Sequence, residues 1–148
     1  QEDIQFIVVH CSATDPTQDI GASDIDKMHR NKGWSAIGYH KVIKRDASLE
    51  NGRALDITGA HVKGHNHHSW GICMVGGVDK GNNPEANFTA QQYLTLSRVV
   101  SELSLMAPDA TVLGHRDLSP DLDGDGVIEK NEWLKACPCF NVGAFYYG

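Results

Sequence analysis

Short apolar runs alternate along the chain with segments of helical periodicity. Ile4–His10 and Trp70–Val75 consist mostly of apolar residues, which is typical of strands buried inside a sheet. Residues 39–45, 49–54 and 110–113 are weaker runs that predict three further strands. The first run ends in a histidine and the last is closely followed by one. The pattern therefore predicts strands whose carboxyl ends carry polar side chains that could belong to a functional site.

The longest helix is predicted over residues 90–106. Apolar side chains recur there at helical spacing. Thr89 and Gln92 have the spacing of a capping box at the start, and Pro108 follows the end. We expect this helix to be structural.

A shorter helix is predicted over residues 23–32. Ser23 and Asp26 have the spacing of a capping box, and Gly33 is placed to end the helix. Strands and helices thus alternate along the chain. This alternation indicates a sheet flanked by helices, either α/β or α+β.

The composition describes one globular domain that spans residues 1–148. The net charge is −6, and no cluster of Lys or Arg is present to bind phosphates, which excludes nucleic acid as a partner. No apolar run approaches the roughly 20 residues that cross a bilayer, so we expect no membrane span. Nothing in the sequence requires a dimer, and we expect a monomer.

An acidic segment near the C-terminus has the spacing of an EF-hand calcium loop. Its twelve positions place carboxylates at 1, 3, 5 and 12, a glycine at 6 and a backbone carbonyl ligand at 7. The predicted calcium ligands are Asp121, Asp123, Asp125, Val127 and Glu132, with Gly126 at the turn. The alternative is a solvated acidic turn without an ion.

The surroundings of this loop favour a structural calcium site over a calcium sensor. Pro120 directly precedes the loop, no helix leads into it, and no second loop of this kind is present. A sensor needs an entering helix and a groove that opens on binding.

Three side chains that can bind a transition metal follow predicted elements or the acidic loop. His10 ends the first strand, His115 follows the last strand, and Cys137 follows the loop. Two imidazoles and one thiolate suit zinc and leave a fourth position open for water. As bare spacing this is a weak signal, because single His and Cys residues are more often packed or exposed without a metal.

Several motifs together resemble the type 2 zinc-dependent N-acetylmuramoyl-L-alanine amidases, which include phage amidase-type lysozymes and the peptidoglycan recognition proteins. The similar stretches follow in order over nearly the whole chain: residues 9–14, 33–34, 38–40, 59–61, 71–72, 76–77 and 135–138. The resemblance implies an α/β fold with a central mixed sheet. It also implies a hydrolase that cleaves the amide between the muramic acid lactyl group and L-alanine of peptidoglycan.

Carried over residue by residue, the resemblance implies that His10, His115 and Cys137 hold zinc. It implies that Tyr39 and Lys135 are catalytic: Lys135 would stabilise negative charge on the carbonyl oxygen, and Tyr39 would orient water or assist proton transfer. The plainer alternative for Tyr39 is a half-buried tyrosine in a strand. For Lys135 it is an exposed lysine without a catalytic role. His61 and Asn66 match positions that contact the muramyl peptide.

The chain departs from the phage-type members between its second histidine and its cysteine ligand, where the calcium loop is inserted at about 117–134. Because Glu132 lies close to Lys135 and Cys137, we expect calcium to order the segment that carries both. Millimolar calcium is an extracellular condition. We therefore expect a secreted or periplasmic protein at the cell wall, or a phage lysin made in the host cytoplasm.

The other cysteines have separate interpretations. Cys11 and Cys73 alternate with apolar residues and are expected to be buried thiols. Cys139 could be a free thiol, a disulfide partner or a substitute zinc ligand, and we favour no role in the site.

Two rival functions remain open. One is a peptidoglycan-binding module without catalysis; such relatives typically lack the cysteine ligand, whereas Cys137 is present here. The other is a calcium-dependent interaction module, which rests on the acidic loop alone.

Overall fold

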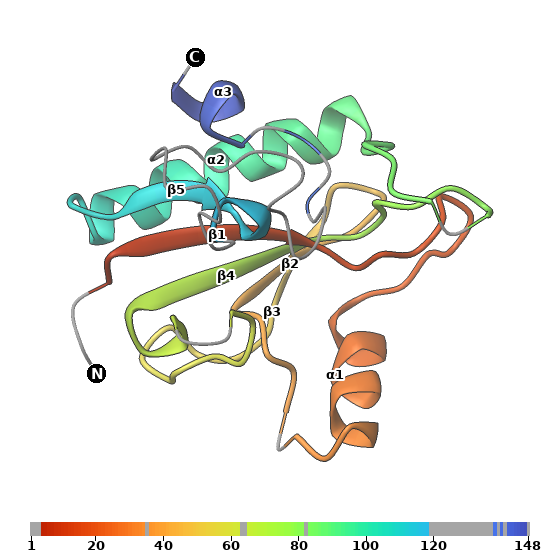
Figure 1. Cartoon of the computed structure of the whole chain (residues 1–148), viewed down its shortest axis with the longest axis horizontal. Coiled ribbons are helices and arrows are strands. Elements are labelled where there is room, and N and C mark those ends of the chain that lie inside the picture. The colour runs from red at the N-terminus through yellow and green to blue at the C-terminus, as the bar shows by residue number, and fades with distance from the viewer. Residues whose placement is uncertain are drawn as a thin grey trace, which may run out of the picture.

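A computed structural model describes residues 4–34, 36–62, 65–81, 83–118, 138, 140 and 142–147. These residues form a five-stranded sheet with a helix packed on each face (Figure 1). Within the described part of the chain, no helix is long and apolar enough to cross a membrane. The predicted fold class is confirmed.

The sheet has the strand order β3-β2-β4-β1-β5, and the four strands other than β3 are parallel to one another. β3 pairs antiparallel with β2 at one edge, so the sheet is mixed. All five predicted strands are present, although β2 and β3 are shorter than expected. Their bounds are Phe6–Cys11 for β1, Lys41–Ile43 for β2, Leu49–Asn51 for β3, Ser69–Met74 for β4 and Thr111–Gly114 for β5.

Side chains of the parallel strands alternate between two buried faces. Ile7, Val9 and Ile72 belong to the larger apolar cluster, together with the buried side of helix α2 (Ala90–Met106). Val42, Cys73 and Val75 belong to a smaller cluster with Ile25 of helix α1 (Ala22–Asn31). By this alternation Val8 and His10 lie on the α1 face.

Three further short helices lie within the described residues. Helix α3 (Val142–Tyr147) packs near β5 on the side of α2 (Figure 1). The 3-10 helix η1 (Asn66–His68) leads into β4, and η2 (His115–Leu118) continues directly from β5. The carboxyl end of β5 therefore passes into a tight turn that starts at His115.

The capping box predicted for α2 is confirmed: the Thr89 hydroxyl accepts from Gln92 N at 3.1 Å, and Gln92 Oε1 accepts from Thr89 N at 3.0 Å. Gln92 is also fully buried. Its Nε2 donates to Val75 O at 3.0 Å, and its Oε1 accepts from Arg45 Nη1 at 3.1 Å. One side chain thus ties the start of α2 to the loops that follow β2 and β4.

The capping box predicted for α1 is wrong. Gly21 is the N-cap, and its N–H donates to the Asp24 carboxylate at 3.0 Å. The helix starts earlier than expected because the Glu50 carboxylate of β3 accepts from Ala22 N at 2.8 Å, a partner that lies far away in sequence. Asp26 instead accepts from Ile37 N at 2.8 Å.

The end of α1 is as expected. Gly33 follows the helix with a φ of 93°, a left-handed conformation that favours glycine. Its N–H donates to Arg30 O at 3.0 Å.

Two buried histidines fasten loops to the sheet. His29 Nδ1 accepts from Gly38 N at 2.9 Å, and His40 Nδ1 accepts from Gly71 N at 3.0 Å. The other nitrogen of His40 donates to Ile57 O at 2.8 Å. Burial lowers the pKa of both imidazoles, so both are neutral near pH 7 and can accept from these amides.

Replacing Gln92 by Leu is expected to lower the free energy of unfolding by about 2–3 kcal/mol, because buried hydrogen-bonding groups lose their partner. Urea denaturation measures this change. Gln91→Leu is the matched control, since Gln91 is exposed on the same helical turn. Equal stabilities of the two variants would show that the buried amide has no structural role.

The buried histidines are expected to make the metal-free fold less stable as the pH falls below 6.5, the ordinary histidine pKa. There the unfolded state takes up protons that native His29 and His40 bind less readily, so stability is complete above pH 6.5 and is lost below it. The carboxylates whose pKa values are lowered act only near and below their ordinary value of 3.8.

Urea denaturation from about pH 7.5 to about pH 5 measures this slope. His40→Gln should reduce the slope relative to the wild-type protein. A free energy of unfolding that is independent of pH in this range would contradict the prediction.

Candidate active site

His10 and His115 lie side by side at the carboxyl edge of the sheet. β1 pairs in parallel with β5 in a register that places Val9 opposite Gly114, so the next residue on each strand is a histidine. The centroids of the two imidazole rings are 4.7 Å apart. His10 is buried and His115 is half-buried, so the pair borders the surface through His115. The structure thus brings together two of the predicted zinc ligands.

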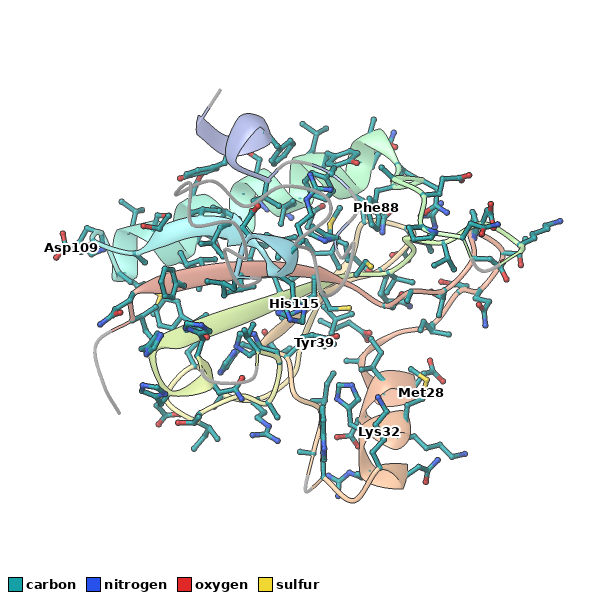
Figure 2. All side chains as sticks on the ribbon, in the orientation of Figure 1. Met28, Lys32, Tyr39, Phe88, Asp109 and His115 are labelled. Atoms are coloured by element: carbon teal, nitrogen blue, oxygen red, sulfur yellow. The ribbon has the colours of Figure 1, made fainter. Side chains whose placement is uncertain are left out.

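Tyr39 lies beside this pair. It precedes β2, and its ring centroid is 5.0 Å from that of His10. The rings of Tyr39 and His115, both labelled in Figure 2, thus each contact the ring of His10. The tyrosine is half-buried, as its plainer interpretation requires, but it faces a predicted metal ligand. This position is compatible with the predicted catalytic role, which stays a prediction.

The segment that carries Tyr39 is held by α1. Besides accepting from Gly38 N, the His29 ring packs 4.5 Å from the Trp34 ring and 5.5 Å from the Tyr39 ring, between centroids. We did not identify His29 from the sequence. A histidine on the buried side of an amphipathic helix gives no sign of which distant ring it contacts.

His61 lies beside His10, against the backbone of Gly71 in β4. Its Nδ1 is 2.9 Å from His10 Nε2, and its Nε2 is 3.2 Å from the Ser69 hydroxyl. Burial, followed by the nearby His40, lowers the pKa of His61 to about 3. The side chain is therefore neutral near pH 7, and only 9% of the residue is exposed.

Asn66 holds the loop that carries His61. Its side-chain oxygen accepts from the backbone N–H groups of His61 and Val62, each at 2.8 Å. The substrate contacts expected of His61 and Asn66 stay a prediction. What the structure adds is that both also have partners within the protein.

The remaining predicted site residues lie outside the described residues. These are Lys135, Cys137 and Cys139, and the calcium ligands Asp121, Asp123, Asp125, Val127 and Glu132. Within the described ranges, no group of three or more His, Cys, Asp or Glu side chains could hold a metal ion. The adjacent imidazoles of His10 and His115 nevertheless fit zinc by donor type, since neutral imidazole is a preferred zinc ligand.

The two cysteines in strands are buried, as predicted. Burial raises the pKa of the Cys73 thiol well above its usual value, and the nearby Cys11 adds to this effect. Cys73 therefore stays protonated and belongs to the apolar packing beneath α1.

Comparison with known proteins identifies the family of this chain. The sequence profile described as N-acetylmuramoyl-L-alanine amidase matches residues 1–138. The endolysin of Enterobacteria phage K11 is 44% identical over 142 residues, which cover 96% of this chain and 84% of that protein.

Solved structures show the same fold. The N-acetylmuramoyl-L-alanine amidase LysC from Clostridium intestinale superposes with a TM-score of 0.71 at 24% identity, covering 92% of this chain and 76% of that one. Drosophila PGRP-LB superposes with a TM-score of 0.67 at 21% identity, covering 93% and 76%. With the profile match over nearly its whole length, the chain belongs to the N-acetylmuramoyl-L-alanine amidase family.

Proposed function

We propose that this protein is a zinc-dependent peptidoglycan hydrolase that cleaves the amide between the lactyl group of N-acetylmuramic acid and L-alanine. The observation that carries the proposal is the meeting of His10, His115 and Tyr39 at one edge of the sheet, in a chain of the amidase family. The similar phage protein is named an endolysin, which supports action on the cell wall.

His10, His115 and Cys137 would hold the zinc ion. When bound, zinc supplies Lewis-acid polarisation of the scissile carbonyl and a water of lowered pKa. The reaction adds the water oxygen to the carbonyl carbon, breaks the bond from carbon to nitrogen and delivers one proton to the leaving amine of L-alanine. The protein must therefore stabilise an oxyanion and move a proton.

Lys135 and Tyr39 would perform these two tasks. An ammonium two residues before a zinc ligand is tethered near the reacting carbonyl, where it can stabilise the developing negative charge. The Tyr39 hydroxyl can orient the attacking water or carry a proton toward the leaving nitrogen. A phenol has an ordinary pKa of about 10, so orientation of water is the simpler role at neutral pH.

Mass spectrometry of purified peptidoglycan after digestion tests this function. The zinc-loaded protein is expected to release stem peptides that begin with L-alanine and to leave peptide-free glycan. If the wall stays intact but retains the protein, the chain is instead a binding module without catalysis.

Tyr39→Phe is expected to lower kcat by about 10²–10⁴-fold, because the ring contact with His10 is kept and the hydroxyl is lost. Kinetics on a soluble muramyl peptide measure this effect. Tyr146→Phe is the matched control, since the Tyr146 hydroxyl meets Ser104 of α2, on the other face of the sheet. Full activity of Tyr39→Phe would exclude a catalytic role for the hydroxyl.

We also propose that the acidic loop from Asp121 to Glu132 binds calcium and orders the segment that carries Lys135 and Cys137. Two arguments support this proposal. The carboxylates have the spacing of an EF-hand calcium loop. A segment that calcium has already ordered would also avoid the entropy cost of becoming ordered when zinc binds. Action at the wall, where calcium is abundant, agrees with this arrangement.

Removal of calcium, or Asp123→Ala, is expected to weaken zinc retention and slow the amidase reaction. Equilibrium dialysis with metal analysis and the digestion assay measure the two effects. Asp109→Ala is the control, because Asp109 is an exposed carboxylate in the turn after α2. Unchanged zinc retention and rate in Asp123→Ala would contradict the proposal.

A further inference from the structure

The imidazole of His61 occupies a slot that two glycines leave open. A Cβ atom at Gly71 would lie 2.7 Å from His61 Cγ, and one at Gly59 would lie 2.8 Å from His61 Cδ2. Real side chains do not approach this closely, so the slot exists only because both positions are glycine. The backbone at Gly59 and Gly71 thus confines the ring of His61, and its two nitrogens have defined directions.

The Ser69 hydroxyl has only one proton, and this fixes the direction of the hydrogen bonds at His61. Ser69 Oγ donates to His65 O at 2.7 Å, and a backbone carbonyl can only accept. Ser69 has no second proton to give, so its oxygen accepts from His61 Nε2 at 3.2 Å. A buried imidazole carries a single ring proton, and in His61 this proton is therefore on Nε2.

The same reasoning extends to His10. With its proton on Nε2, His61 presents a lone pair at Nδ1, and His10 Nε2 lies 2.9 Å away. His10 must then donate from Nε2, which leaves the lone pair of its own ring on Nδ1. A chain of three hydrogen bonds thus runs from the His65 carbonyl through Ser69 and His61 to His10.

We propose that His61 is a positioning residue that holds His10 in the tautomer with its lone pair on Nδ1, through which the ring would bind zinc. A hydrogen bond from the second ring nitrogen of a metal-bound histidine fixes its tautomer and orientation and raises its basicity. The inference rests on the proposed zinc site. It differs from the substrate contact expected of His61, and the two roles have different experimental signatures.

The test compares His61→Leu, His61→Asn and Ser69→Ala. Leu removes the acceptor for His10 Nε2, whereas the Asn side-chain oxygen can occupy the place of Nδ1 and restore it. Ser69→Ala removes the oxygen that accepts from His61 Nε2. Thr95→Val is the matched control, because Thr95 is a buried α2 residue whose hydroxyl donates to a backbone carbonyl, Ala47 O, at 2.8 Å.

Two measurements are made on the full chain without substrate. Zinc affinity is obtained by competition with a chromophoric chelator, and long-range proton–nitrogen NMR reports the His10 tautomer in the zinc-free protein. His61→Leu is expected to weaken zinc binding about 10–100-fold and to mix the His10 tautomers. Ser69→Ala should act in the same direction, His61→Asn should recover most of the affinity, and Thr95→Val should match the wild type.

Wild-type zinc affinity and an unchanged His10 tautomer in His61→Leu would overturn the inference. If kinetics on a soluble muramyl peptide show a raised KM for His61→Leu while its zinc affinity is unchanged, His61 is assigned to the substrate instead. If the wild-type protein binds no zinc, the proposed zinc site fails, and the His10 tautomer in the variants still decides whether His61 orients that ring.

Discussion

The parallel pairing of β1 with β5 is the constraint on which the site depends. Its register sets Val9 opposite Gly114, and the residue that follows on each strand is a histidine. A slip of one residue would turn His10 toward the apolar layer beneath α2 and separate it from His115. The apolar alternation of β1 therefore fixes both the packing and the position of the predicted metal ligands, since a single register must satisfy both.

The two faces of the sheet differ in the side chains that they bury. The α2 face is a continuous apolar layer in which one buried amide, that of Gln92, connects helix to sheet. The α1 face has a smaller apolar cluster and carries His10, His61 and Tyr39 near the carboxyl edge. Buried polar groups are costly unless every hydrogen bond is made, and here backbone groups and neighbouring rings supply the partners. The predicted site residues His10, His61 and Tyr39 thus lie on a face whose buried polar groups are hydrogen-bonded within the protein.

Much of the fold was predictable from local pattern. Five strands, the long helix with its capping box and the glycine that ends α1 all follow from periodicity and end signals, which depend on neighbours in the sequence. The start of α1 was not predictable, because the Glu50 carboxylate that caps it comes from a strand 28 residues away. The proposed zinc ligands and catalytic residues were predicted from motifs, and the structure shows how His10, His115 and Tyr39 meet.

The sequence by itself determined the order of elements, the residues at strand ends and the family to which they point. Only the tertiary structure decided which of these side chains contact one another, and which ring nitrogen of each histidine forms the hydrogen bond. His29 and Ser69 had no signal in the sequence, because a histidine on a buried helical face or a serine at the start of a strand is unremarkable until its partner is known. Local propensity acts over a few residues, whereas hydrogen-bond direction depends on groups that folding alone brings within hydrogen-bond distance.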